Sequence, residues 1–178
     1  MNEEKKGTGS ADLIRQLEST DASTVVKALH KLARGGSVRD LPSVIRAMSR
    51  VTDQSLLEHF TSFLSNIRSK EAPEVIVGFL TDPSCSAIRA ELTRSCWESQ
   101  LDYSPYLILF TRLFITSDFM EAVEAFSVIE SSCIEREVSN PVISEIISLV
   151  NSSIPDQTEE KKRLSAELIR ALSPYLSA

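Results

Sequence analysis

The sequence is poor in the residues that build tight turns and covalent cross-links. Its 178 residues include 5 glycines and 7 prolines, fewer than a turn-rich β-sandwich needs. The three cysteines, Cys85, Cys96 and Cys133, are odd in number and form no Cys-x-x-Cys pair. This spacing argues against a disulfide framework and against a zinc site. We therefore expect a helical protein with free, buried thiols.

Motifs of catalysis and of nucleotide binding are also missing. The sequence has 2 histidines, His30 and His59, and it contains no HExxH, GxSxG or GxxxxGK motif. Acidic pairs such as Glu121 and Glu124 are typical of solvated helix faces. The sequence thus predicts no catalytic residue, no metal ligand and no cofactor.

Long apolar runs and an excess of positive charge are lacking too. The longest apolar stretch, residues 106–115, contains Arg112 and is about half the length that spans a bilayer. A formal net charge of −6 disfavours nucleic acid as a partner. The first ten residues are polar and carry no apolar signal core. We expect a cytoplasmic protein that binds neither membrane nor nucleic acid.

The charge is spread unevenly along the chain. Residues 1–70 hold 11 Lys and Arg against 8 Asp and Glu, whereas residues 71–178 hold 8 against 17. These counts give a balance of +3 for the first segment and −9 for the second. The two ends of the molecule therefore suit differently charged partners, although a solvated surface accounts for the same pattern.

Four prolines mark an internal repeat. Pro42, Pro73, Pro105 and Pro141 lie 31, 32 and 36 residues apart, and Ala11 occupies the position 31 residues before the first. Proline is favoured in the first turn of a helix, where its missing N–H costs nothing. Apolar residues at offsets of two, three and six lie on one face of that helix. The residues at these offsets are Leu13, Ile14, Leu17, Val44, Ile45, Met48, Val75, Ile76, Phe79, Leu107, Ile108, Thr111, Ile143, Ser144 and Ile147.

Two of these positions, Thr111 and Ser144, depart from the apolar pattern. In the fourth unit, Leu113 and Phe114 are expected to take over the buried face. A second helical pattern follows each proline-marked helix after a turn, and an aspartate stands where it can cap that second helix. These aspartates are Asp21, Asp53, Asp82 and Asp118. We predict a tail over residues 1–10 and one all-α domain over residues 11–178, with five helix pairs and no strands.

The stretch "TDPSCSAIRAEL", residues 81–92, resembles the inter-helix turn and second helix of HEAT repeats. Asp82 and Pro83 are followed there by Ile88, Arg89 and Ala90, and residues 20–48 look similar. The resemblance implies a right-handed α-α superhelix, a solenoid of about five HEAT-like hairpins. It also implies contacts between Asp and Arg of neighbouring repeats, and a concave surface, lined by second helices, that binds another protein or a peptide.

The segment "CWESQLDYSPYLILFTRLF", residues 96–114, holds the one tryptophan and two of the 3 tyrosines. Trp, Tyr and Arg are favoured at binding hot spots. Simple packing between repeats explains the same residues equally well. The candidate partner-binding residues are Arg89, Arg94, Trp97, Tyr103 and Tyr106.

We therefore expect a non-catalytic adapter that binds a partner protein or peptide on its concave face. An enzyme or lyase-type subunit that holds a small molecule in the groove is one alternative. A structural homodimer that uses the apolar faces of the last two units is the other.

Overall fold

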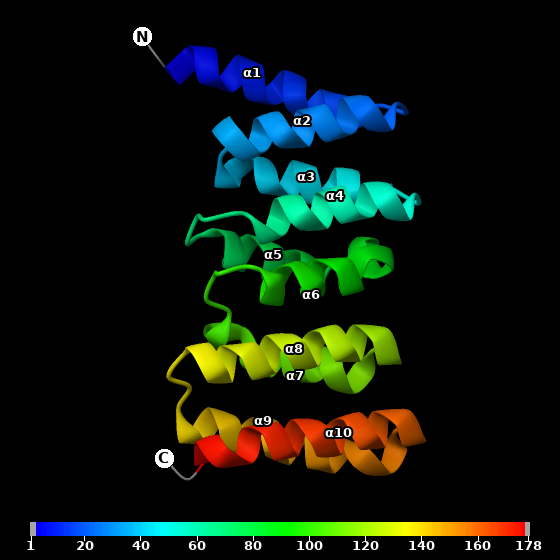
Figure 1. Ribbon diagram of the computed structural model, residues 1–178, viewed down its shortest axis with the longest axis vertical. Helices are drawn as coiled ribbons and strands as arrows, with labels where there is room; N and C mark the ends of the chain where they lie inside the picture. Colours follow the sequence, from blue (N-terminus) through cyan, green and yellow to red (C-terminus); the bar gives the residue numbers. More distant parts are fainter. Residues whose placement is uncertain (1–2, 177–178) are drawn as a thin grey trace. The chain divides into compact units, whose positions relative to one another are not determined.

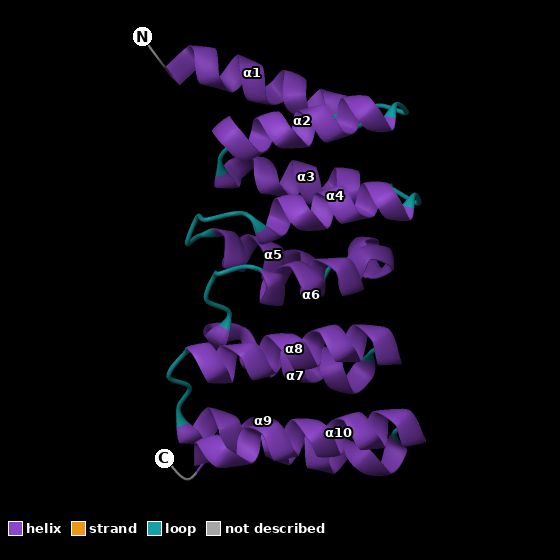
Figure 2. Cartoon of the chain, viewed as in Figure 1, coloured by secondary structure: helices purple, strands orange, loops and turns teal. Residues whose placement is uncertain are grey.

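The computed structural model describes the backbone of residues 3–176 and the side chains of residues 9–176. Over these residues the chain is helical and contains no strand (Figure 2), so the predicted all-α class is confirmed. The α-helices of the described residues are α1 (Glu3–Gln16), α2 (Ala22–Gly35), α3 (Leu41–Met48), α4 (Gln54–Ser65), α5 (Ala72–Leu80), α6 (Arg89–Glu98), α7 (Leu107–Thr116), α8 (Phe119–Glu135), α9 (Asn140–Ser153) and α10 (Glu159–Leu172).

Contacts within the chain divide it into two compact units, residues 1–101 and 102–178. The sequence predicted one domain over residues 11–178, and the two units are described separately below. Helix α1 begins at Glu3, ahead of the expected boundary at residue 11. The predicted tail over residues 1–10 is therefore helical from residue 3 onward.

The prolines begin helices as their spacing predicts. Pro42, Pro73 and Pro141 lie in the first turns of α3, α5 and α9. Pro105 lies in a short 3-10 helix, Ser104–Tyr106, that leads directly into α7. In each case the fixed backbone angle of proline suits the first turn, and its missing N–H leaves no donor unpaired.

The four aspartates cap the segments that follow them, as expected. The Asp21 carboxylate accepts N–H groups at the start of α2, Asp53 does so for α4, and Asp118 for α8. Asp82 caps a 3-10 helix, Pro83–Ile88, that precedes α6. Thr158 takes the same role for α10. The turn and the cap together fix where each second helix starts.

In the first unit, helices of the same kind pack on one another. The second helices α2, α4 and α6 contact each other in chain order, and α3 packs on α5 in a layer behind them (Figure 1). Fully buried side chains from both layers fill the space between them. They include Ala28, Leu29, Val44, Ile45, Met48, Phe60, Leu64, Ile76, Leu80 and Leu92.

The second unit repeats this arrangement with two helix pairs. Helix α7 packs on α8 and α9, and α10 packs on α8 and α9. Phe110 and Phe114 of α7 are fully buried, together with Ile129 of α8 and Ile146 of α9. Each pair therefore covers the apolar face of the other.

The predicted register holds for α3 but shifts in α5. Val44, Ile45 and Met48 are all buried in α3. In α5, Val75 and Phe79 are only half-buried, and the buried face runs through Ile76, Val77 and Leu80 instead. Helix α5 is apolar on more than one side, so its sequence left the rotation of the helix open.

The two departures in the pattern have different outcomes. Thr111 is fully buried, and its hydroxyl avoids an unpaired donor because it donates to the Leu107 carbonyl at 2.8 Å. Ser144 is exposed. Leu113 and Phe114 are buried beside Thr111. Their predicted part in the buried face is confirmed.

One buried cation ties α10 to the end of α7. The Lys161 ammonium donates to the carbonyls of Ile115 and Ser117, each at 2.7 Å, and the Gln157 amide donates to the Ile115 carbonyl at 3.0 Å. The last carbonyls of a helix lack partners within the helix and carry partial negative charge. Burial lowers the pKa of Lys161, and the nearby charges of Asp118 and Glu121 oppose that shift.

Removal of one helix cap tests how the turns contribute to stability. The Asp53 carboxylate accepts the Leu56 N–H at 2.8 Å. Asp53→Ala loses this bond and should lower the free energy of unfolding by about 1 kcal/mol. Asp53→Asn keeps a capping oxygen and should stay close to wild type. Urea denaturation followed by circular dichroism measures both, and equal losses would contradict the capping role.

Two buried residues of α10 make a matched pair of substitutions. Lys161→Ala should cost about 2–3 kcal/mol, because it leaves the two carbonyls without their charged donor. The Ser165 hydroxyl is buried and has no hydrogen-bond partner among the described residues, so Ser165→Ala should be neutral or slightly stabilising. Denaturant titrations of the two variants, one helical turn apart, compare them directly. An equal loss from both would show that cavity formation, and not the lysine bonds, decides the effect.

Candidate functional site

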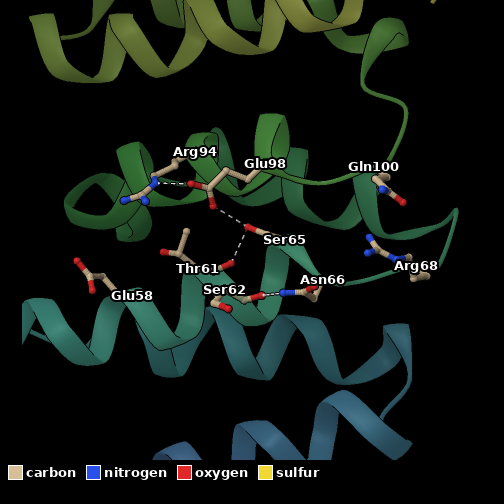
Figure 3. A pocket seen from close by; sticks show the side chains of 9 residues that line it. All are labelled: Glu58, Thr61, Ser62, Ser65, Asn66, Arg68, Arg94, Glu98 and Gln100. Carbon is tan, nitrogen blue, oxygen red and sulfur yellow. Dashed lines mark hydrogen bonds and ion pairs between the residues drawn. The ribbon is translucent and has the colours of Figure 1, made fainter. Parts of the chain in front are cut away.

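The described part of the chain has an open polar groove in the first unit, between α4 and α6. Its volume is about 380 Å³. Helix α4 and the residues after it form one wall, and α6 forms the other (Figure 3). The lining residues are Glu58, Thr61, Ser62, Ser65, Asn66, Arg68, Arg94, Glu98 and Gln100.

A charged clamp crosses the middle of this groove. The Arg94 Nε donates to Glu98 Oε1 at 2.7 Å within α6, and the Ser65 hydroxyl of α4 lies 3.1 Å from Glu98 Oε2. Both carboxylate oxygens of Glu98 therefore have partners. The clamp holds the two helices in register and fixes the Arg94 side chain at the groove surface.

Hydroxyl side chains line the groove below this clamp. Thr61 donates to the Leu57 carbonyl at 3.0 Å, and Ser65 lies 2.9 Å from the Thr61 carbonyl. The Asn66 amide donates to the Ser62 carbonyl at 2.8 Å. These bonds stay within one helix, so the hydroxyl and amide groups need no hydrogen-bond partner from a neighbouring helix, and the groove surface remains polar.

A second hollow adjoins the groove at Asn66 and Arg68, which line both. It has a volume of about 260 Å³ and lies between the end of α2, the 3-10 helix Val38–Asp40 and the segment after α4. Apolar side chains contribute much of its lining: Leu32, Ala33, Val38, Leu41, Phe63 and Ile67. The first unit thus offers a polar and an apolar hollow next to each other.

A third hollow, between α2 and α4, brings the two histidines together. His30 and His59 both line it, with Lys27 and Asp53, and both imidazoles belong to exposed residues. In the sequence, the two histidines do not occupy equivalent positions of the repeat. Across the described residues, no group of three or more His, Cys, Asp or Glu side chains is arranged to hold a metal ion.

The five predicted binding residues fall into two groups. Arg89, Arg94 and Trp97 belong to α6; Arg94 lines the polar groove, Trp97 is 39% exposed and Arg89 is half-buried. Tyr103 and Tyr106 belong to the second unit.

The two tyrosines differ from the accessible residues that were predicted. Tyr103 is only 2% exposed, and its ring meets Phe110 edge-on at 6.0 Å. Tyr106 is half-buried just ahead of α7. The structure therefore makes Tyr103 a core residue, because an aromatic ring beside an apolar helix contributes more when it is buried.

The sequence did not single out Arg68, Asn66 or Glu98. Arg68 and Asn66 follow the end of α4. Polar residues are common after the end of a helix whether or not they bind a partner, so their residue type gave no signal. The repeat gave one usable signal: both walls of the groove are second helices, which the HEAT resemblance assigns to the binding surface.

Asp82, which the HEAT resemblance pairs with an arginine of a neighbouring repeat, binds within its own turn. Asp82 accepts the Ser84 N–H at 2.9 Å. This bond and one to the Ser84 hydroxyl lower the pKa of Asp82, and the charge of Arg46 on α3 adds to the shift. The Arg46 guanidinium also lies 5.7 Å from the centre of the Phe79 ring.

Comparisons with known proteins gave no match: no family model, no curated protein and no solved structure is similar to this chain. No helix among residues 3–176 combines the length and the apolar character that crossing a bilayer requires.

The three thiols, the strongest nucleophiles in the sequence, are all buried, and none of them forms a disulfide. Burial raises the pKa of Cys133 to about 11 and also raises that of Cys85. A thiol must be deprotonated and accessible to react. Iodoacetamide at pH 8 should therefore modify the native chain much more slowly than the chain in 8 M urea, as followed by mass spectrometry. Rapid alkylation of the native chain would contradict this burial.

Proposed function

We propose that the chain is a non-catalytic adapter that binds a segment of a partner protein along the surface of its second helices. In this proposal the five helix pairs form a right-handed HEAT-like solenoid. In each unit, second helices pack on second helices and first helices on first helices, which is the packing that a solenoid of hairpins needs.

The polar groove between α4 and α6 is the observation that carries the proposal. It is open and lined by side chains of both charges, and the hydroxyls at its base bond to their own helix. A binding surface needs fixed charges and exposed hydrogen-bonding groups at its rim, and the Arg94–Glu98 ion pair supplies one fixed charge of each sign there. The exposed ring of Trp97 on the same helix adds a hot-spot residue.

A cytoplasmic location is part of the proposal. None of the three cysteines forms a disulfide, and reduced thiols are typical of a reducing compartment. A partner protein in the same compartment is therefore the natural occupant of the groove.

Capture of a partner by the tagged full-length chain tests this function. Arg94→Glu with Trp97→Ala should lower the recovery of a specifically captured protein about tenfold or more, because the change reverses the fixed charge and removes the aromatic ring. Quantitative mass spectrometry of the captured proteins gives the readout.

Arg15→Glu is the matched control, since it makes the same charge change on the exposed surface of α1, whose Arg15 bridges Asp12. It should leave capture unchanged. Circular dichroism must show that every variant is folded. Full capture by the folded double variant would remove this surface as the binding site.

A further inference from the structure

We propose that the apolar hollow beside the polar groove binds one apolar side chain of a partner peptide, and that Arg68 binds a carboxylate of the same peptide. This inference rests on the proposed adapter function and names the chemistry of its partner. The occupant is a short acidic segment that carries Leu, Ile, Met or Phe.

The size and lining of the hollow favour a single side chain. Its volume of about 260 Å³ lies below the roughly 300–1,000 Å³ of typical small-molecule sites. Leu32, Phe63 and Ile67 supply apolar surface from three segments of the chain. Burial of a Leu or Phe side chain against such surface is favourable, so the hollow suits one apolar anchor of a peptide.

Arg68 supplies the charge beside the hollow. Its side chain lines the polar groove (Figure 3) and also the apolar hollow. It is exposed and forms no hydrogen bond or salt bridge with another described residue. A guanidinium binds a carboxylate through two parallel hydrogen bonds. An arginine without a partner, next to an apolar hollow, is therefore complementary to an acidic peptide.

Two carboxylates of the two linings, those of Asp40 and Glu98, accept hydrogen bonds from other groups. Asp40 accepts the Ser10 hydroxyl at 2.5 Å and the Ser37 N–H at 2.8 Å. Glu98 is held by Arg94 and Ser65. Glu58 lines the groove ten residues before Arg68, and the two side chains lie at opposite ends of the groove in Figure 3. These hydrogen bonds leave the charge of Asp40 in place, but no carboxylate of the described residues forms an ion pair with Arg68.

Selection from a random twelve-residue peptide library displayed on phage tests the inference, with the full-length chain immobilised. The wild type should enrich peptides in which an apolar residue lies within about four positions of Asp or Glu. Arg68→Glu should abolish the preference for acidic residues. Ala33→Trp, at an exposed position of the hollow, should block the enrichment by filling the space. Arg15→Glu should select the same peptides as the wild type.

An enriched peptide, labelled and titrated by fluorescence anisotropy, should bind Arg68→Glu at least tenfold more weakly, and its wild-type affinity should fall as salt rises. Enrichment of peptides without acidic residues, unchanged selection by the Arg68 variant, or no enrichment over the blank surface would overturn the inference. If one of these results occurs while the Arg94 and Trp97 variant still loses partner capture, the adapter function is retained. Only the proposed class of acidic peptide is then rejected.

Discussion

A pair of short helices cannot bury its apolar face by itself, and this constraint shapes the whole structure. Within each unit, a pair buries its apolar face against a neighbouring pair, with first helices packed on first helices and second helices on second helices. The layer formed by α2, α4 and α6 then presents one side to the core and the other to solvent. The hollows of the first unit lie along this layer, which makes them a consequence of the repeat.

The starts of the helices were predictable because they depend on local chemistry. A proline fits the first turn of a helix, and a carboxylate caps the next one, whatever lies around them. The rotation of an individual helix was less predictable. In α5 the buried face passes through Val77 and Leu80, with Val75 and Phe79 half-buried, since an apolar nine-residue helix offers several faces of similar hydrophobicity.

The candidate site was harder to predict for the same physical reason. Arg94 was expected on a binding surface because of its residue type and its repeat position. Tyr103 was grouped with it because the two are close in sequence, yet the tyrosine ring is buried against Phe110. The proposed binding role of Arg68 depends on its neighbours in α2 and α6, which lie some 30 positions away in the sequence. No local pattern reports such neighbours.

The hydroxyl residues between α4 and α6 explain how one layer serves both stability and recognition. Thr61, Ser65 and Thr93 are buried, and each hydroxyl lies within hydrogen-bond distance of a carbonyl one turn earlier in its own helix. Such residues pack closely without leaving unpaired donors. The interface therefore needs few large apolar groups, and charged residues can stand at its rim without an unfavourable buried charge. A repeat layer built from Leu and Phe alone would be more apolar, and it would select a partner by shape with little selection by charge.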